Sequence, residues 1–172
     1  VYSMIRITGM LRSFMLSLFF IIASNAVADK VEETEPDWFK VSILDLRDDL
    51  QDVRALNKKY LILYMMQSDC GFCSINLARN WGDTAIVAYL TNYFEVLSLD
   101  VRGNRELTDF YGKTQTEKQY AHEHGFEFTP TLVFIDVAGL EVFRLPGLRK
   151  KQQFKAALEY VVGEHYKKVK FN

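Results

Sequence analysis

The stretch QSDCGFCS contains both cysteines of the chain, Cys70 and Cys73, separated by two residues. A pair at this spacing can form a redox-active disulfide, supply two ligands to a metal site, or carry a covalently attached haem. A purely structural disulfide is a weaker explanation, because a bond within one turn closes a very small loop and gains little chain entropy. The residues around the pair distinguish between these chemistries.

The chain lacks the further ligands that a zinc site or a covalently attached haem would need. Structural zinc normally takes four protein ligands, of which the cysteines supply two. The histidines are His122, His124 and His165, and the i, i+2 spacing of the first two points their rings apart on a helix. Covalent haem attachment requires a histidine directly after the second cysteine, where this chain has Ser74. The sequence favours a redox-active dithiol, and we expect no metal and no cofactor.

The neighbouring elements are predicted to place Cys70 at the start of a helix. The apolar run Tyr60–Met66 (YLILYMM) predicts a buried strand, and a helical pattern follows the cysteines. At a helix N-terminus the free N–H groups and the helix dipole stabilise a thiolate, which is the reactive form of cysteine. Cys70 is then the nucleophile, and the more buried Cys73 resolves the mixed disulfide. The charge of Asp69 partly opposes thiolate formation.

Hydrophobic periodicity predicts alternating helices and strands along the rest of the chain. Helices are expected at residues 46–58, 74–81, 83–93, 114–125 and 150–166, and strands at 60–66, 94–100, 126–135 and 140–145. Thr114–Glu117 (TQTE) fits a capping box at the start of the fourth helix. Strands joined through helices are expected to be parallel, and the last two strands to form an antiparallel hairpin.

The stretch Val101–Lys113 (VRGNRELTDFYGK) is a polar connection without a clear period. The sequence leaves two roles open for it, recognition of a client protein and packing over the core.

The first 28 residues predict a cleavable secretory signal peptide. Arg6 and Arg12 precede the apolar run FMLSLFFIIA, and Ala26–Ala28 (AVA) supplies the small-x-small pattern of a cleavage site. The apolar run is too short to cross roughly 30 Å of hydrocarbon as a helix. Residues 29–45 are then expected to form an N-terminal leader and residues 46–168 a single folded domain.

Composition gives no reason to expect a nucleic-acid partner. The chain has 172 residues, 49% of them hydrophobic, and a formal net charge of -1. These values describe an ordinary globular domain without a basic surplus.

The segment Phe128–Thr131 (FTPT) places a proline inside a predicted strand, where it removes a hydrogen-bond donor. From the residues alone, two explanations stay open: a cis bond between Thr129 and Pro130 facing the active site, or an ordinary trans proline on an edge strand.

Together, the strand, the C-x-x-C helix start and a T-P-T segment before a hairpin and a last helix resemble the thioredoxin superfamily. More narrowly, the long connection before FTPTLVFID and the stretch EVFRLPG resemble periplasmic thioredoxin-related proteins associated with bacterial sulfur oxidation. The resemblance implies an α/β thioredoxin fold, with a central mixed four-stranded sheet flanked by helices. It implies a thiol–disulfide oxidoreductase in the periplasm.

The resemblance also implies roles for individual residues. Cys70 and Cys73 are the redox pair, and Thr129–Pro130 is expected to be cis, with the Thr129 backbone pairing to an extended substrate segment. Gly147 matches a glycine beside that groove. Gly71 and Phe72 lie at its rim, where Phe72 either packs against the substrate or caps the helix start.

Implied partners are protein disulfide clients, such as a cysteine carrier protein or an apocytochrome, and a membrane thiol-electron transporter. The protein is expected to be a monomer.

One departure from the family concerns proton transfer. Thioredoxins keep a buried aspartate six residues before the first cysteine, and this chain has Tyr64 there; the lysine usually near it is replaced by Val96. Proton transfer at Cys73 must then use water, Tyr64 or another group, which leaves a disulfide isomerase or oxidase open beside a reductase of protein disulfides. A non-catalytic peptide-binding module is a separate alternative.

Overall fold

Four strands form the central sheet of the computed structural model, which describes residues 35–171. They are β1 (Tyr60–Met66), β2 (Phe94–Asp100), β5 (Thr131–Asp136) and β6 (Glu141–Pro146), in the order β2-β1-β5-β6. β1 and β2 are parallel, whereas β5 runs antiparallel to β1 and β6 antiparallel to β5. The predicted mixed four-stranded sheet is confirmed. The prediction that helix-joined strands are parallel holds for β1 and β2 and is wrong for β5. The predicted signal peptide lies outside the described residues.

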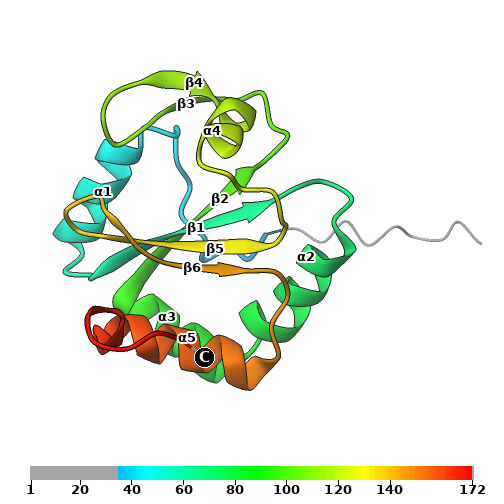
Figure 1. Ribbon diagram of the computed structural model, residues 1–172, viewed down its shortest axis with the longest axis vertical. Coiled ribbons are helices and arrows are strands. Elements are labelled where there is room, and N and C mark those ends of the chain that lie inside the picture. Colours follow the sequence, from blue (N-terminus) through cyan, green and yellow to red (C-terminus); the bar gives the residue numbers. More distant parts are fainter. Residues whose placement is uncertain (1–34, 172) are drawn as a thin grey trace, which may run out of the picture. The chain divides into compact units, whose positions relative to one another are not determined.

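Helices cover both faces of the sheet (Figure 1). They are α1 (Leu46–Ala55), α2 (Gly71–Asn76), the π-helical η1 (Leu77–Trp81), α3 (Thr84–Tyr93), α4 (Glu117–Glu123), α5 (Lys151–Val162) and the short 3-10 helix η2 (His165–Lys167). One core cluster lies under η1, α3 and α5, and the other under α1 and α4. Within residues 35–171, no helix is long and apolar enough to span a membrane.

The alternation of side chains in β1 explains its continuous apolar sequence. Tyr60, Ile62 and Tyr64 belong to the first core cluster, and the residues between them belong to the second. All seven residues except the last are buried. A strand whose two faces are both covered needs apolar residues at every position.

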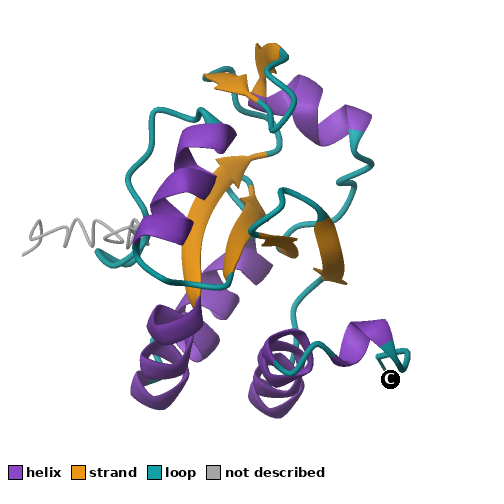
Figure 2. Cartoon of the chain, turned by 90° about the vertical axis from the view of Figure 1, so that its left-hand side faces the viewer, coloured by secondary structure: helices purple, strands orange, loops and turns teal. Residues whose placement is uncertain are grey.

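The polar connection before α4 is folded and contributes to the core. It contains β3 (Glu106–Thr108), which pairs antiparallel with β4 (Thr114–Thr116) in a separate two-stranded sheet. Leu107 of β3 is fully buried in the second cluster. In both views the two-stranded sheet lies beside α4, on the opposite side of the molecule from the C-terminus (Figures 1 and 2). Packing is therefore at least one role of this connection.

The start of α4 differs from its prediction. Thr114 lies in β4, and the capping box is formed two residues later, where the side chains of Thr116 and Gln119 bond to each other's backbone N–H groups. This leaves Glu117 free for a tertiary contact. Its carboxylate, 1% exposed, accepts from the Asp100 N–H at 3.0 Å and from the Arg105 guanidinium at 2.6 and 3.0 Å. Glu117 thus ties the connection to the end of β2.

The third predicted strand and the fifth predicted helix differ in their bounds from the observed elements. The strand predicted from residue 126 begins at Thr131, because the preceding proline has no N–H for the sheet and Phe128 O instead accepts from the Thr131 hydroxyl at 2.6 Å. The last predicted helix is divided, since α5 ends at Val162 and Gly163 caps it before η2 begins.

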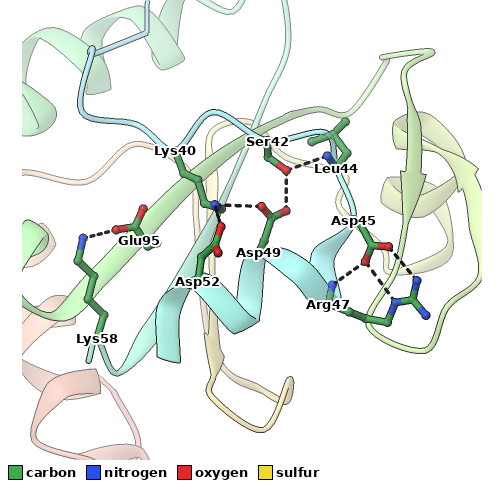
Figure 3. A network of polar contacts seen from close by, with 9 residues as sticks. All are labelled: Lys40, Ser42, Leu44, Asp45, Arg47, Asp49, Asp52, Lys58 and Glu95. Carbon is green, nitrogen blue, oxygen red and sulfur yellow. Dashed lines mark hydrogen bonds and ion pairs between the residues drawn. The ribbon is translucent and has the colours of Figure 1, made fainter. Parts of the chain in front are cut away.

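Residues 35–45, part of the predicted leader, pack onto the fold. Phe39 is 6% exposed and belongs to the first core cluster, and the Lys40 N–H donates to Val96 O of β2 at 2.7 Å. The Lys40 ammonium contacts two carboxylates of α1, those of Asp49 and Asp52 (Figure 3). Burial raises the pKa of Asp49 against the opposing effects of its Ser42 and Lys40 contacts. The segment is therefore fastened to both β2 and α1.

Candidate active site

The two cysteines form a disulfide at the start of α2. Cys70 is the N-cap, with extended backbone, and the helix begins at Gly71. The S–S distance is 2.04 Å and the two Cα atoms are 5.2 Å apart. Cys70 Sγ also accepts from the Cys73 N–H at 3.1 Å. The Cys73 N–H at the start of α2 therefore contacts both Cys70 O, at 2.9 Å, and the Cys70 sulfur. Cys70 lies at the helix N-terminus, as the sequence predicted.

The two cysteines differ in accessibility. Cys70 is 9% exposed and Cys73 is 2% exposed. Phe72, between them, is 63% exposed, and no heavy atom lies within 4 Å of the position where Gly71 would carry a Cβ. An incoming disulfide therefore reaches Cys70 more readily than Cys73, along an open and partly apolar rim.

Three chain segments meet at the edge of the sheet that carries the disulfide. Met65, near the end of β1, pairs with Thr131 at the start of β5, and Thr131 pairs with Pro146 at the end of β6. The cysteine loop, the segment before Thr131 and the segment after Pro146 therefore leave the sheet at one edge, on the right-hand side of Figure 1. The structure thus gathers the residues that the sequence singled out.

The proline segment is bonded to the turn after β6. The Thr129–Pro130 peptide bond is cis, and Pro130 is buried while Thr129 is partly exposed. Pro130 O accepts from the Gly147 N–H at 2.7 Å. Gly147 has a φ of +75°, a conformation that residues with a Cβ rarely adopt. Glycine at this position allows the left-handed backbone conformation of the turn.

Tyr64 occupies a structural position behind the disulfide. It is fully buried, and its hydroxyl donates to Cys73 O at 3.3 Å. Its ring packs edge-on against Trp81 and Phe39, with centroid distances of 5.4 and 6.0 Å. At the position of the thioredoxin aspartate, this chain therefore has an aromatic side chain that supports the active-site helix.

Sequence reasoning missed two buried amides beneath the same helix. Asn76 and Asn80 are 1% and 0% exposed, and Asn80 Nδ2 donates to Asn76 Oδ1 at 2.7 Å and to Arg149 O at 3.2 Å. Their i, i+4 spacing was the available signal, but the same spacing also suits a pair on an exposed helix face. Within residues 35–171, no group of three or more histidine, cysteine or carboxylate side chains gathers as a metal site.

The sequence matches the thioredoxin-like domain family over residues 46–162. This is more than half of the chain, and the protein therefore belongs to the thioredoxin superfamily. No curated protein gives a significant match to the sequence.

Solved structures show the same fold. A thioredoxin-fold protein from Helicobacter pylori aligns with a TM-score of 0.56 and 21% identity, over 66% of this chain and 75% of its own. A thioredoxin from Thermus thermophilus aligns with a TM-score of 0.55 and 24% identity, over 69% of this chain and 85% of its own. The protein is similar to both in architecture.

Proposed function

We propose that the protein is a periplasmic thiol–disulfide oxidoreductase that reduces disulfides in client proteins. The observation that carries this proposal is the position of Cys70, whose sulfur accepts an N–H at the helix start and is the more accessible of the pair. Membership of the thioredoxin superfamily supports the same chemistry. The proposed location rests on the signal sequence predicted in the first 28 residues.

The reaction consists of two thiol–disulfide exchanges. The Cys70 thiolate attacks one sulfur of the client disulfide, forming a mixed disulfide and releasing the first client thiolate. Cys73 loses its proton to water and attacks Cys70 Sγ, which forms the Cys70–Cys73 disulfide and releases the second client thiolate. The client gains two electrons and the protein loses two.

We propose that an extended client segment binds beside the disulfide. Thr129 lies directly before the buried Pro130, and the Gly147 N–H donates to Pro130 O. We propose that the Thr129 backbone pairs with the client and that Gly71 and Phe72 form the opposite rim. Clients of this kind include a cysteine carrier protein or an apocytochrome.

The cycle requires a thiol donor that reduces the Cys70–Cys73 disulfide again. We propose a membrane thiol-electron transporter for this role, acting on the protein as a monomer.

Trapping with a Cys73→Ser variant tests this function. Without the resolving thiol, Cys70 should remain joined to its client, and the adduct should disappear on treatment with dithiothreitol. A Cys70→Ser variant is the matched control, because it keeps one cysteine but lacks the accessible nucleophile. Wild-type protein should also reduce a generic protein disulfide such as that of insulin. Failure of both trapping and reduction would contradict catalysis and favour the peptide-binding module.

A further inference from the structure

The pair of buried amides on α2 and η1 is an unusual choice of residues for packing. Asn76 and Asn80 lie on the buried side of α2 and η1, the segment that begins at the disulfide. A buried amide destabilises the fold unless its polar atoms are hydrogen-bonded, so an apolar pair would serve a packing role better. Asn80 Nδ2 meets this requirement by donating to Asn76 Oδ1 and to Arg149 O.

The donor of Asn76 has no such partner. Among residues 35–171, Asn76 Nδ2 has no hydrogen-bond acceptor, although the residue is 1% exposed. Asn80 Oδ1 and Arg149 Nε are likewise buried without a partner. A buried donor of this kind calls for an explanation in the function of the site.

Cys73 is the nearest candidate acceptor for this donor on the same helix face. Cys73 is three residues before Asn76, so both lie on one face of α2, and helical side chains lean toward the preceding turn. Asn76 Oδ1 is held by Asn80, one turn further along. The Nδ2 group of the same amide remains available as a donor, and in the oxidised structure it bonds to no acceptor among residues 35–171, Cys73 Sγ included.

Reduction changes the hydrogen-bonding requirement of the Cys73 sulfur. In the disulfide its sulfur is a weak acceptor, whereas a Cys73 thiolate is a charge in a site that is 2% exposed and requires a donor. Of the titratable residues nearby, Cys70 is bonded to Cys73 and Asp69 directly precedes Cys70 in the sequence. Arg149 meets the amide pair through its backbone carbonyl, which accepts from Asn80 Nδ2. The Tyr64 hydroxyl donates to the Cys73 carbonyl.

We propose that the side-chain amide of Asn76 donates a hydrogen bond to Cys73 Sγ when the pair is reduced, and so stabilises the thiolate that resolves the mixed disulfide. This inference rests on the proposed function. Asn76 transfers no proton and no electron; the proton of Cys73 still leaves to water. Asn80 acts as a positioning residue, because its bond to Asn76 Oδ1 fixes which way the amide faces.

The test is the reduction potential of an Asn76→Asp variant in thiol–disulfide buffers. Aspartate keeps an oxygen for the Asn80 donor and replaces Nδ2 by a second acceptor. We expect the equilibrium constant for reduction to fall about tenfold, which lowers the potential by about 30 mV. In a Cys70→Ser background, alkylation of Cys73 should shift to higher pH. A potential and an alkylation profile equal to wild type would overturn the proposal.

A matched control separates this role from packing. Gln115→Leu removes another buried amide, in β4 and away from α2, and Asn76→Leu makes the same change at the site. Both should alter thermal stability, but only Asn76→Leu should lower the potential. Equal potentials in the two leucine variants would show that Asn76 is structural.

A measurement on the wild-type protein avoids dependence on variants that fail to fold. The Asn76 side-chain NH₂ resonances should shift on reduction and should then titrate with Cys73. Resonances that do not change would refute the contact. If the wild-type protein does not exchange with thiols at all, the proposed function itself is refuted. If it exchanges normally but the Asn76 NH₂ resonances do not change, only the role of Asn76 is refuted.

Discussion

Replacing Phe39 by alanine tests whether the segment before α1 is part of the folded unit. Phe39 is 6% exposed, and its ring packs against Trp38, Trp81 and Tyr64 with centroid distances of 4.8, 5.2 and 6.0 Å. Truncation of a buried phenylalanine to alanine typically costs about 3–5 kcal/mol, through lost burial and the cavity left behind. We expect about 3 kcal/mol, at the lower end of this range.

The assay is thermal unfolding of the oxidised protein followed by circular dichroism. For a domain of this size, each kcal/mol corresponds to about 4 °C, so the midpoint should fall by about 12 °C. Val41→Ala is the control in the same segment, since Val41 is 94% exposed and should change stability by less than about 0.5 kcal/mol. Similar midpoints for the two variants would refute the packing of this segment.

Three further predictions concern the active-site turn, the folded connection and the response to acid. Gly147→Ala should lower the free energy of unfolding by about 1–2 kcal/mol in urea denaturation, because the φ of Gly147 is +75°. Gly71→Ala is the control: its Cβ would have equal space and its φ is not positive, so it should be neutral or slightly stabilising. Glu117→Gln should cost about 1–2 kcal/mol in the same assay, because it weakens the charged hydrogen bonds to the Arg105 guanidinium, which is half exposed. Asp83 caps α3, and its contact with Lys151 lowers its pKa below the ordinary 3.8. A lowered folded pKa gives stability that is present at neutral pH and lost as the pH falls below about 4. Asp83→Asn should therefore lose less unfolding free energy than wild type between pH 7 and pH 3.

Each of these predictions has a clear opposing result. Equal effects at the two glycines would show that backbone conformation does not decide the outcome at Gly147. An unchanged unfolding free energy for Glu117→Gln would show that the connection is held by packing alone. The same acid response in wild type and Asp83→Asn would remove Asp83 as a source of acid sensitivity.

The elements nearest the chemistry were the most predictable from sequence. The run Tyr60–Met66 is β1 with the predicted bounds, because a strand covered on both faces has a strong and unambiguous pattern. Cys70 lies at a helix N-terminus as predicted, since the strand end and the C-x-x-C spacing are local signals.

Errors arose where a local pattern had two readings that only tertiary structure separates. Thr114–Glu117 matches a capping box, yet Thr114 pairs in β4 and Glu117 is buried against Arg105. Residues 35–45 are polar and charged enough for a leader, but Phe39 is an aromatic anchor whose partners are distant in sequence. The roles of Asn76 and Tyr64 depend on the burial of their side chains. The sequence around a single residue does not determine whether that residue is buried.

The central claim is that the Cys70–Cys73 pair reduces client disulfides. The most direct measurement is its reduction potential in the mature protein, obtained by equilibration in thiol–disulfide buffers. A reductase should give a value at or below about -220 mV, toward the -270 mV of thioredoxin. A value above about -180 mV would contradict the claim and indicate disulfide formation or isomerisation instead.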